Sequence, residues 1–353
     1  MSKTFDVIVI GGGQSGLACG YYLKRVKLDF LILDKQPTPG GAWLHAWDSL
    51  TLFSPAEYSS LPGWFMPKTE HKFPLREQVV DYLTKYENHY QLPVKRGVEV
   101  LQVTKENDIF QVVTSNGVYQ SKTVISATGT WGNLFIPQLK GIETFNGLQI
   151  HSAHYKSPDK FVGLKTLVVG EGNSGAQIVA EVSKVTDVKW STKREPQYLP
   201  DEVDGYYLFN VASAKYRAEK EGKTFDASEF NLGNIVMVPS VKEARERGVL
   251  ISSGTFTELY EQGVIWENRE KEAFDAIIWC TGFGYDTNHL KSLVSLDKKG
   301  ITKTQESKSS EIKGLWLVGY GNWTGYASAT LIGIHRTTKQ TIQEIKEYLT
   351  ENK

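Results

Sequence analysis

Apolar residues gather along the chain in short continuous runs and in helical stripes. Residues 6–10 read Asp-Val-Ile-Val-Ile, which is typical of a strand buried on both faces of a parallel sheet. We expect a helix over 15–25 and a second strand over 29–34. The same order of strand, glycine turn, helix and strand returns over 165–192. The pattern predicts two nucleotide-binding units about 160 residues apart, a spacing too long for a solenoid repeat.

Together these units predict an α/β fold with two dinucleotide-binding, Rossmann-like domains. Two predicted strands end in Thr-Gly, near residues 129 and 282, and we expect the chain to pass between domains there. The further predicted elements are a helix over 76–90, a hairpin of 110–114 with 118–122 around Asn116-Gly117, a strand over 123–127, an insertion over about 200–250 with helical patches at 214–221 and 241–247, strands over 276–282 and 314–319, and an amphipathic helix over 330–349.

The composition of the chain excludes several classes of protein. The 353 residues include 40 basic and 40 acidic side chains, and this zero net charge argues against a nucleic-acid partner. Hydrophobic residues make up 40% of the chain, which excludes general disorder. No apolar run approaches the roughly 20 residues of a membrane span, and no signal peptide is evident, so we expect a soluble, cytoplasmic protein without a membrane partner.

Cysteine usage limits the chemistry. Cys19 and Cys280 are the only cysteines, and their separation provides no disulfide framework, no metal-ligand spacing and no CxxC redox pair. Redox chemistry would therefore need a bound cofactor, and we expect no metal site.

The first glycine loop has the spacing GxGxxG. Gly11, Gly13 and Gly16 would give a tight turn, close approach of the backbone to a pyrophosphate, and close packing of the helix on the strand. Amides at Ser15 and Gly16 would face the anion. Asp34, at the end of the second strand, is placed to accept hydrogen bonds from ribose hydroxyls. The alternative, a glycine turn without a ligand, is disfavoured by this context.

The second glycine loop, over 170–175, has the same spacing but a different strand ending. Thr192, Lys193 and Arg194 stand where the first unit has a carboxylate. A guanidinium can bind a ribose 2′-phosphate through two hydrogen bonds, which favours NADP over NAD. The alternative is a solvated pair of cations, and the neighbouring Glu195 weakens the preference for phosphate.

Between the loops lies the motif FxGxxxHxxxY, made by Phe145, Gly147, His151 and Tyr155. This motif resembles the fingerprint of the class B flavoprotein monooxygenases, which include flavin-containing and Baeyer–Villiger monooxygenases. The Baeyer–Villiger members usually have Trp at the last position. The resemblance extends over nearly the whole chain, and it is that of a short bacterial flavin-containing monooxygenase.

The resemblance implies a fold and an activity. An FAD domain, 1–138 and 286–353, would be split by an inserted NADPH domain, 139–285. The enzyme would use NADPH and O₂ to oxygenate small apolar soft nucleophiles, sulfides or amines, through a flavin C4a-hydroperoxide. A Baeyer–Villiger reaction on ketones would be a side activity. NADH is a second candidate coenzyme, and a homodimer is compatible with the sequence.

The candidate site residues follow from the loops and the resemblance. Cofactor-binding candidates around the first loop are Gly11, Gly13, Gln14, Ser15, Gly16, Asp34, Lys35, Gly41, Ala42, Trp43, Ala127, Thr128, Gly129 and Asn322, and those around the second loop are Gly170, Gly172, Asn173, Ser174, Gly175, Thr192, Lys193, Arg194, Thr281 and Gly282. Phe53 and His151 are the candidate catalytic residues; Phe53 would replace an Asn near the flavin, and His151 would mainly link the domains.

Two alternatives stay open. A pyridine nucleotide–disulfide reductase shares the two-loop layout, but the usual redox-active cysteine pair is missing. A flavin-binding sensor, or an NADPH oxidase, would have the same loops without oxygenating a substrate. The aromatic residues over 43–65 are expected as core, with only their density as a group favouring an apolar substrate pocket.

Overall fold

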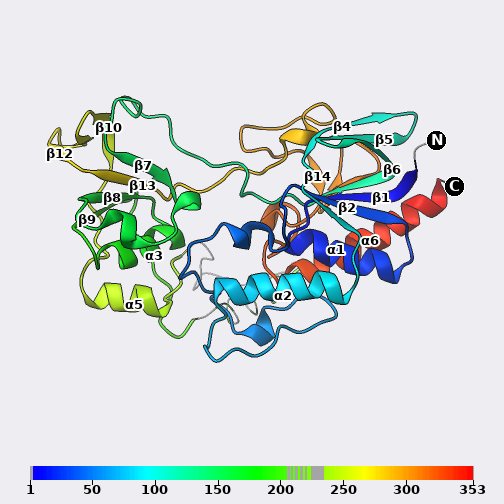
Figure 1. Ribbon diagram of the computed structural model, residues 1–353, viewed down its shortest axis with the longest axis horizontal. Coiled ribbons are helices and arrows are strands. Elements are labelled where there is room, and N and C mark those ends of the chain that lie inside the picture. The colour runs from blue at the N-terminus through cyan, green and yellow to red at the C-terminus, as the bar shows by residue number, and fades with distance from the viewer. Residues whose placement is uncertain are drawn as a thin grey trace. The chain divides into compact units, whose positions relative to one another are not determined.

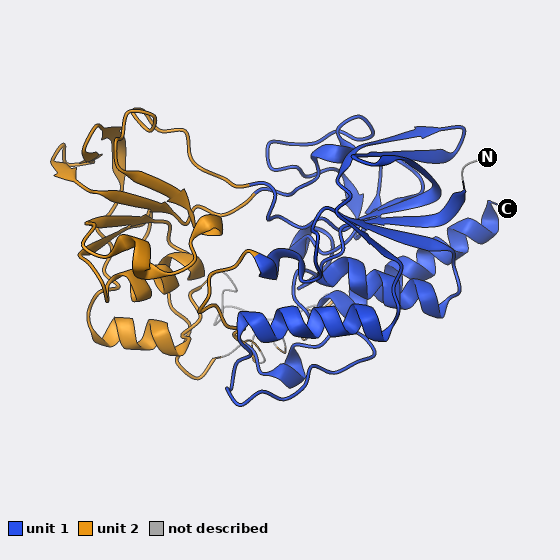
Figure 2. Cartoon of the chain, viewed as in Figure 1, with its two compact units in different colours: residues 1–44, 54–133, 284–353 blue, residues 45–53, 134–283 orange. Residues whose placement is uncertain are grey.

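The computed structural model describes residues 3–203 and 234–352, with 205, 207, 210, 214, 218 and 221–223 from the segment between them. The chain forms two compact units (Figure 2). Unit 1 comprises Met1–Leu44, Ser54–Asn133 and Gly284–Lys353, and unit 2 comprises His45–Phe53 and Leu134–Phe283. The α/β class expected from the sequence is confirmed. The division into an FAD domain and an NADPH domain stays a prediction.

Unit 1 is built on a mixed sheet with nine strands among the described residues. Its parallel centre has the order β16-β6-β1-β2-β3, and β14 and β15 extend it beyond β16. The strands are β1 Thr4–Ile10, β2 Phe30–Asp34, β3 Val94–Arg96, β4 Val100–Glu106, β5 Ile109–Thr114, β6 Gly117–Ser126, β14 Thr304–Gln305, β15 Lys308–Ser309 and β16 Leu315–Leu317.

Helices cover this sheet, with α1 and α6 side by side (Figure 1). The helices are α1 Gln14–Arg25, α2 Arg76–His89 and α6 Ile334–Glu351, with short 3-10 turns η1 Gly41–Leu44, η2 Ala56–Tyr58, η5 Asn288–Leu290 and η6 Gly321–Trp323. The expected helix over 330–349 begins four residues later, because residues 330–333 form a turn in which the Thr330 hydroxyl accepts from the Gly333 amide at 2.9 Å. Among the described residues, no helix combines the length and apolar character of a membrane span.

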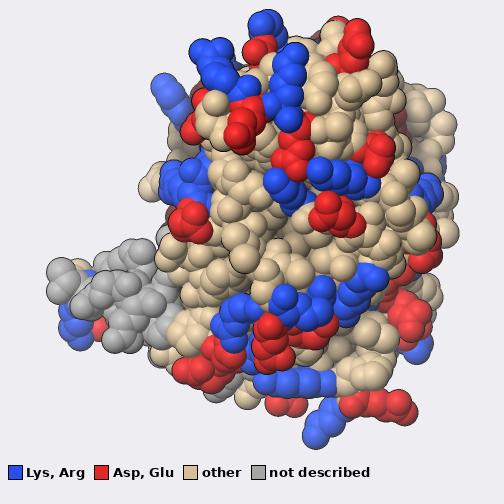
Figure 3. Space-filling view, turned by 90° about the vertical axis from the view of Figure 1, so that its left-hand side faces the viewer, with Lys and Arg blue, Asp and Glu red and all other residues tan. Residues whose placement is uncertain are grey.

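Unit 2 contains a four-stranded parallel sheet, β7-β13-β8-β9, and a separate three-stranded antiparallel sheet, β10-β11-β12. On the face shown in Figure 3, acidic and basic side chains are interspersed. The elements are β7 Leu148–His151, η3 Ser152–His154, η4 Pro158–Phe161, β8 Thr166–Val169, α3 Asn173–Val182, β9 Val188–Ser191, α5 Pro239–Glu246, β10 Phe256–Tyr260, β11 Gly263–Trp266, β12 Lys271–Ala273 and β13 Ala276–Trp279.

The strand β6 combines two elements that the sequence pattern separates. Its first half pairs antiparallel with β5, and its second half pairs parallel with β1. Ser121 takes part in both pairings, opposite Phe110 on one side and Phe5 on the other. The pattern divides this strand because its first residues are half-exposed while residues 123–126 are buried on both faces.

Residues 45–53 belong to unit 2 although the chain on both sides belongs to unit 1. We call this segment the strap. The Asp48 amide donates to the Lys156 carbonyl at 2.9 Å, and the Lys156 ammonium donates to the His45 carbonyl at 2.7 Å. Trp47 packs edge-to-face on Tyr155, with ring centroids 6.4 Å apart. Backbone and ring contacts thus hold the strap, and no local sequence signal predicts it.

The segment predicted as an insertion is described in part. The helical patch expected at 241–247 is found as α5, with Val241 and Ala244 buried in the core of unit 2. The patch expected at 214–221 lies mostly outside the described residues.

The Tyr155 hydroxyl is buried and donates to Glu181 Oε2 at 2.8 Å, and the Ser49 hydroxyl of the strap donates to Glu181 Oε1. We expect Tyr155→Phe to reduce the free energy of unfolding by about 1–2 kcal/mol, because a buried bond to a carboxylate is lost. Tyr198→Phe is the matched control, since its hydroxyl makes only a 3.3 Å bond. Urea unfolding measures both, and equal losses would contradict this role of the Glu181 bond.

Candidate nucleotide-binding sites

The first glycine loop connects β1 to α1. At two of its glycines, the backbone lies in close contact with another backbone carbonyl. Gly11 has φ +104°, and a Cβ there would lie 2.5 Å from the Ala127 carbonyl oxygen. A Cβ on Gly16 would lie 1.8 Å from the Gly11 carbonyl oxygen. Side chains are excluded at both positions. Gly13, by contrast, would place a Cβ no closer than 3.6 Å to the nearest atom, in Gly41.

Two other segments pack around this loop. The Trp43 indole donates to Gln14 Oε1 at 3.2 Å, and Gln14 Nε2 donates to the Ala329 carbonyl at 2.7 Å. A Cβ on Gly41 would lie 2.8 Å from Gly13 Cα, so η1 also touches the loop. The structure therefore brings together residues from 11–16, 41–44 and the segment that precedes α6.

A cavity of about 210 Å³ opens at the carboxyl ends of β1 and β2. Ligands of open parallel sheets commonly bind at this edge. The Lys35 ammonium and Asp286 Oδ2 are 3.0 Å apart, and the Thr128 hydroxyl donates to the Asp286 carbonyl. The lining includes Gly11, Asp34, Lys35, Thr128, Asp286 and His289.

Asp34 lies in this cavity with an exposed fraction of only 6%. Its Oδ2 forms an ion pair with Arg96, and its Oδ1 accepts from the Gln36 amide at 3.2 Å. Burial raises the pKa of the Asp34 carboxyl, and the Arg96 guanidinium opposes that rise. His289 is also buried, which lowers its pKa to about 4, and its Nε2 lies 3.1 Å from Ser126 Oγ. Sequence reasoning missed Arg96, Asp286 and His289.

The second glycine loop repeats this construction between β8 and α3. Gly170 has φ +130°, and a Cβ there would lie 2.2 Å from the Cys280 carbonyl oxygen. A Cβ on Gly175 would lie 2.2 Å from the Gly170 carbonyl oxygen, whereas a Cβ on Gly172 would have no neighbour within 4 Å. The Asn173 side chain accepts from the Val236 amide at 2.8 Å, so it braces a neighbouring segment.

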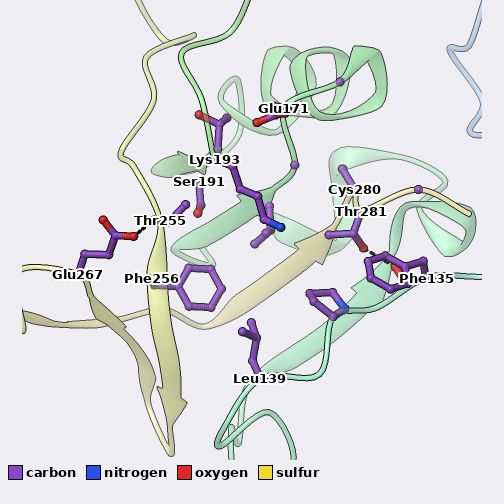
Figure 4. A pocket seen from close by; sticks show the side chains of 16 residues that line it. Phe135, Leu139, Glu171, Ser191, Lys193, Thr255, Phe256, Glu267, Cys280 and Thr281 are labelled. Atoms are coloured by element: carbon purple, nitrogen blue, oxygen red, sulfur yellow. Dashed lines mark hydrogen bonds between the residues drawn. The ribbon is translucent and has the colours of Figure 1, made fainter. Parts of the chain in front are cut away.

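A cavity of about 710 Å³ lies beside the second loop. Phe256 forms part of its wall, and Lys193 extends into it (Figure 4). Arg194 is exposed and lies outside the described lining residues; its amide donates to Glu171 Oε2 at 3.0 Å. Thr192 is buried, and its hydroxyl lies 2.6 Å from Ser252 Oγ. The two cations that the sequence places side by side therefore differ in their access to the cavity.

Two carboxylates also line this cavity, Glu171 and Glu267. Glu267 accepts a hydrogen bond from the Thr255 hydroxyl at the edge of the cavity (Figure 4). Thr281 and Gly282 complete the lining at the carboxyl end of β13. Sequence reasoning missed Glu267 because it lies in the turn between β11 and β12 of the antiparallel sheet, which the hydrophobic pattern does not predict.

The fingerprint residues are structural in their contacts. A Cβ on Gly147 would lie 2.4 Å from the Phe145 ring, so the two residues pack together. His151 is buried, and its Nδ1 accepts from the Ala153 amide at 3.1 Å. Its proton is therefore on Nε2, which donates to the Gly282 carbonyl at 3.0 Å. Burial lowers the pKa of His151 and favours this neutral form.

The other two single-residue candidates are more exposed. Phe53, at the end of the strap, is 40% exposed, and its carbonyl accepts from the Gly205 amide at 2.7 Å. Asn322 is exposed in η6. Its buried neighbour Tyr320, which sequence reasoning missed, is 2.6 Å from Ser126 Oγ and 2.7 Å from Thr128 Oγ1 through its hydroxyl.

Comparisons with known proteins place the chain among nucleotide-dependent oxidoreductases. The pyridine nucleotide-disulphide oxidoreductase family matches residues 8–207. The structure of a flavin-containing monooxygenase from Stenotrophomonas maltophilia is 43% identical, with a TM-score of 0.90 over 99% of this chain and 100% of that one. An oxidoreductase of Geobacillus kaustophilus, described as CzcO-like, is 31% identical over 94% of this chain and 95% of its own length. A probable indole-3-pyruvate monooxygenase of Arabidopsis thaliana is 27% identical over 89% of this chain and 84% of its own.

The fold and the two loops define an oxidoreductase that uses a flavin and a nicotinamide nucleotide. The chain belongs to the pyridine nucleotide-disulphide oxidoreductase family. Within it, the resemblance to the flavin monooxygenases is confirmed.

Two of the three glycines of the second loop, Gly172 and Gly175, allow the effects on packing and on nucleotide binding to be measured separately. Gly175→Ala forces a methyl group against a backbone carbonyl, and we expect it to lower the free energy of unfolding by about 1–3 kcal/mol. Gly172→Ala should leave stability within about 0.5 kcal/mol, because its methyl has open space.

We expect Gly172→Ala to weaken binding of a nicotinamide nucleotide, with NADPH as the probe, roughly tenfold, because the methyl group occupies the space where a pyrophosphate would approach. Denaturant unfolding and NADPH titration measure the two effects. Wild-type NADPH affinity in Gly172→Ala would show that the pyrophosphate does not lie against this loop.

Proposed function

We propose that the protein is an FAD- and NADPH-dependent monooxygenase that transfers one oxygen atom from O₂ to soft nucleophiles, with sulfides and amines as substrates. Unit 1 would hold FAD and unit 2 would hold NADPH. The observation that carries this proposal is the pair of glycine loops, each beside a cavity at the carboxyl edge of a parallel sheet. The 43% identity to a flavin-containing monooxygenase over 99% of the chain supports the reaction class.

The residues of unit 1 fit an FAD molecule. The amino terminus of α1 has no side-chain cap, so its first amides are available to a pyrophosphate. Gly13 leaves room for close approach of that group, and Asp34 presents a carboxylate to the adjoining cavity. A ribose with two free hydroxyls matches this acceptor.

The residues of unit 2 fit a nicotinamide dinucleotide. Helix α3 also has no side-chain cap: its N-cap is Gly172, where a Cβ would have no neighbour within 4 Å. Phe135, Leu139 and Phe256 give the cavity an apolar wall, and Lys193 supplies a cation. These features suit an adenosine with a phosphorylated ribose.

The flavin, when bound, supplies the redox chemistry, accepting hydride from the nicotinamide and activating O₂. The protein's own groups bind and orient. His151 holds the Gly282 carbonyl through its Nε2 proton, which fixes the backbone at one wall of the second cavity. Ketone oxygenation would be the weaker activity, because the fingerprint ends in Tyr155 rather than Trp.

A thiol–disulfide reaction has less support. Cys19 lies in α1 of unit 1, and Cys280 follows β13 in unit 2. Both are buried, and burial raises the pKa of each thiol. A buried thiol with a raised pKa is a poor nucleophile.

The oxygenase activity can be tested with methyl phenyl sulfide, NADPH and ¹⁸O₂. We expect one ¹⁸O atom in each sulfoxide formed, and sulfoxide as the major product per NADPH consumed. Mass spectrometry and a peroxide assay measure this. Oxygen consumption that ends entirely in hydrogen peroxide, with sulfides and amines alike, would favour a sensor or an NADPH oxidase instead. The Cys19→Ser, Cys280→Ser double variant should keep the stoichiometry, and loss of NADPH turnover there would favour a reductase.

Coenzyme choice can be tested at the two neighbouring cations. We expect Lys193→Ala to raise the KM for NADPH about tenfold with little change for NADH, because a charged bond to the 2′-phosphate is lost. Arg194→Ala is the matched control and should have a smaller effect, since Arg194 lies outside the described lining of the cavity. Steady-state kinetics with both coenzymes measures this. An equal rise for NADPH and NADH in Lys193→Ala would refute phosphate recognition at this residue.

A further inference from the structure

Arg96, at the end of β3, lies between two carboxylates beside the first glycine loop. Its Nη1 pairs with Asp34 Oδ2 at the end of β2, and its Nη2 pairs with Glu87 Oε2 on α2. The exposed side-chain fractions are 14% for Arg96, 7% for Asp34 and 13% for Glu87. Ion pairs at this depth are screened far less than surface pairs.

This arrangement explains a glycine that the GxGxxG spacing leaves unassigned. A Cβ on Gly12 would lie 2.8 Å from Asp34 Oδ2 and 3.2 Å from Arg96 Nη1. The φ angle of Gly12 is not in the left-handed region, so its backbone conformation alone does not require glycine. Glycine is required there because any side chain would collide with the Asp34–Arg96 ion pair. The glycine loop, the end of β2 and the end of β3 are therefore packed directly against one another.

Among the groups that favour the charged form of Asp34, Arg96 has the largest effect. Burial raises the pKa of this carboxyl, and the opposing groups are Arg96 first, then the amides of Gln36 and Gly12, and last Lys35. Lys35 is itself paired with a carboxylate, that of Asp286.

The other titratable groups around the cavity cannot replace the guanidinium. Glu99 and Asp286 are acidic, and His289 is buried with a pKa lowered to about 4, so it is neutral near pH 7. Without Arg96, a nearly buried carboxyl would keep only its amide donors and one partly engaged ammonium.

We propose that Arg96 is a positioning residue of the FAD site: it keeps Asp34 ionised and aimed at the ribose diol of the adenosine end of FAD, with Glu87 orienting the guanidinium from its far side. The inference rests on the proposed function, in which unit 1 holds FAD. Arg96 acts through Asp34 and needs no contact with the nucleotide. Its effect is therefore confined to ligands that carry the adenosine.

The test is titration of the flavin-free, full-length protein with FAD and with FMN at about pH 7.5 and 5.5. Flavin fluorescence is the readout of binding. We expect Arg96→Met to raise the Kd for FAD roughly tenfold at the higher pH and further at the lower, because loss of the guanidinium raises the pKa of the Asp34 carboxyl further and disfavours its charged form. FMN binding should not change, since FMN lacks adenosine. Wild type should show a smaller change in FAD affinity between the two pH values than Arg96→Met does, because Arg96 opposes the rise in the pKa of Asp34.

Three further variants separate electrostatics from packing. Arg96→Lys retains the charge and should recover most FAD affinity at both pH values. Asp34→Asn should weaken FAD binding without dependence on pH, and adding Arg96→Met to it should cause no further loss. Lys85→Met is the matched control, because it removes an exposed cation from α2, the helix that carries Glu87, and should change nothing.

The proposal would be overturned if Arg96→Met bound FAD as tightly as the wild-type protein does. Equal weakening of FAD and FMN, with a lower unfolding temperature, would also overturn it by showing a packing role. If Arg96→Met does not fold, Arg96→Gln and Arg96→Lys decide between charge and packing by the same titrations. Failure of the proposed function looks different: wild-type protein would then show no preference for FAD over FMN.

Discussion

The close approach of a glycine turn to the end of the neighbouring strand is the constraint on which both units depend. Gly11 meets the carbonyl of Ala127 after β6, and Gly170 meets the carbonyl of Cys280 after β13. In each unit the approached carbonyl precedes a Thr-Gly pair, just before the chain leaves for the other unit. One backbone contact therefore fixes both the curvature of a phosphate-binding loop and the start of a crossing, and a side chain at the glycine would disturb both.

The two glycine loops share the GxGxxG spacing, but the side chains that follow the neighbouring strands differ between them. In unit 1, Asp34 is nearly buried against Arg96, so the acceptor is rigid and its charge is set by the protein. In unit 2, Lys193 follows the end of the corresponding strand, β9, by two residues; it is exposed and reaches into a larger cavity. A fixed carboxylate suits a ligand that stays bound. In the proposed function, an exposed cation beside a larger cavity would suit a coenzyme that enters and leaves in each cycle.

The sequence predicted the elements that carry local signals and missed those decided by distant partners. The β1–α1–β2 and β8–α3–β9 units were predictable because continuous apolar runs meet glycine loops. Strand β3 has only three residues, none of them buried, and its pairing with β2 makes it a strand. The role of Arg96 could not be predicted for the same reason: the carboxylate of Asp34 is 62 positions away, and no periodicity connects the two residues. The strap likewise depends on Tyr155 and Lys156, far along the chain.

The strap has a consequence for dissecting the molecule. Because residues 45–53 belong to unit 2, the chain passes between the units four times, and no single cut-and-join operation isolates either unit intact. A fragment spanning 134–283 would expose the Tyr155 ring where Trp47 packs and leave Glu181 without the Ser49 hydroxyl. A chimera that exchanges the coenzyme unit with that of a relative would have to exchange the nine-residue strap as well.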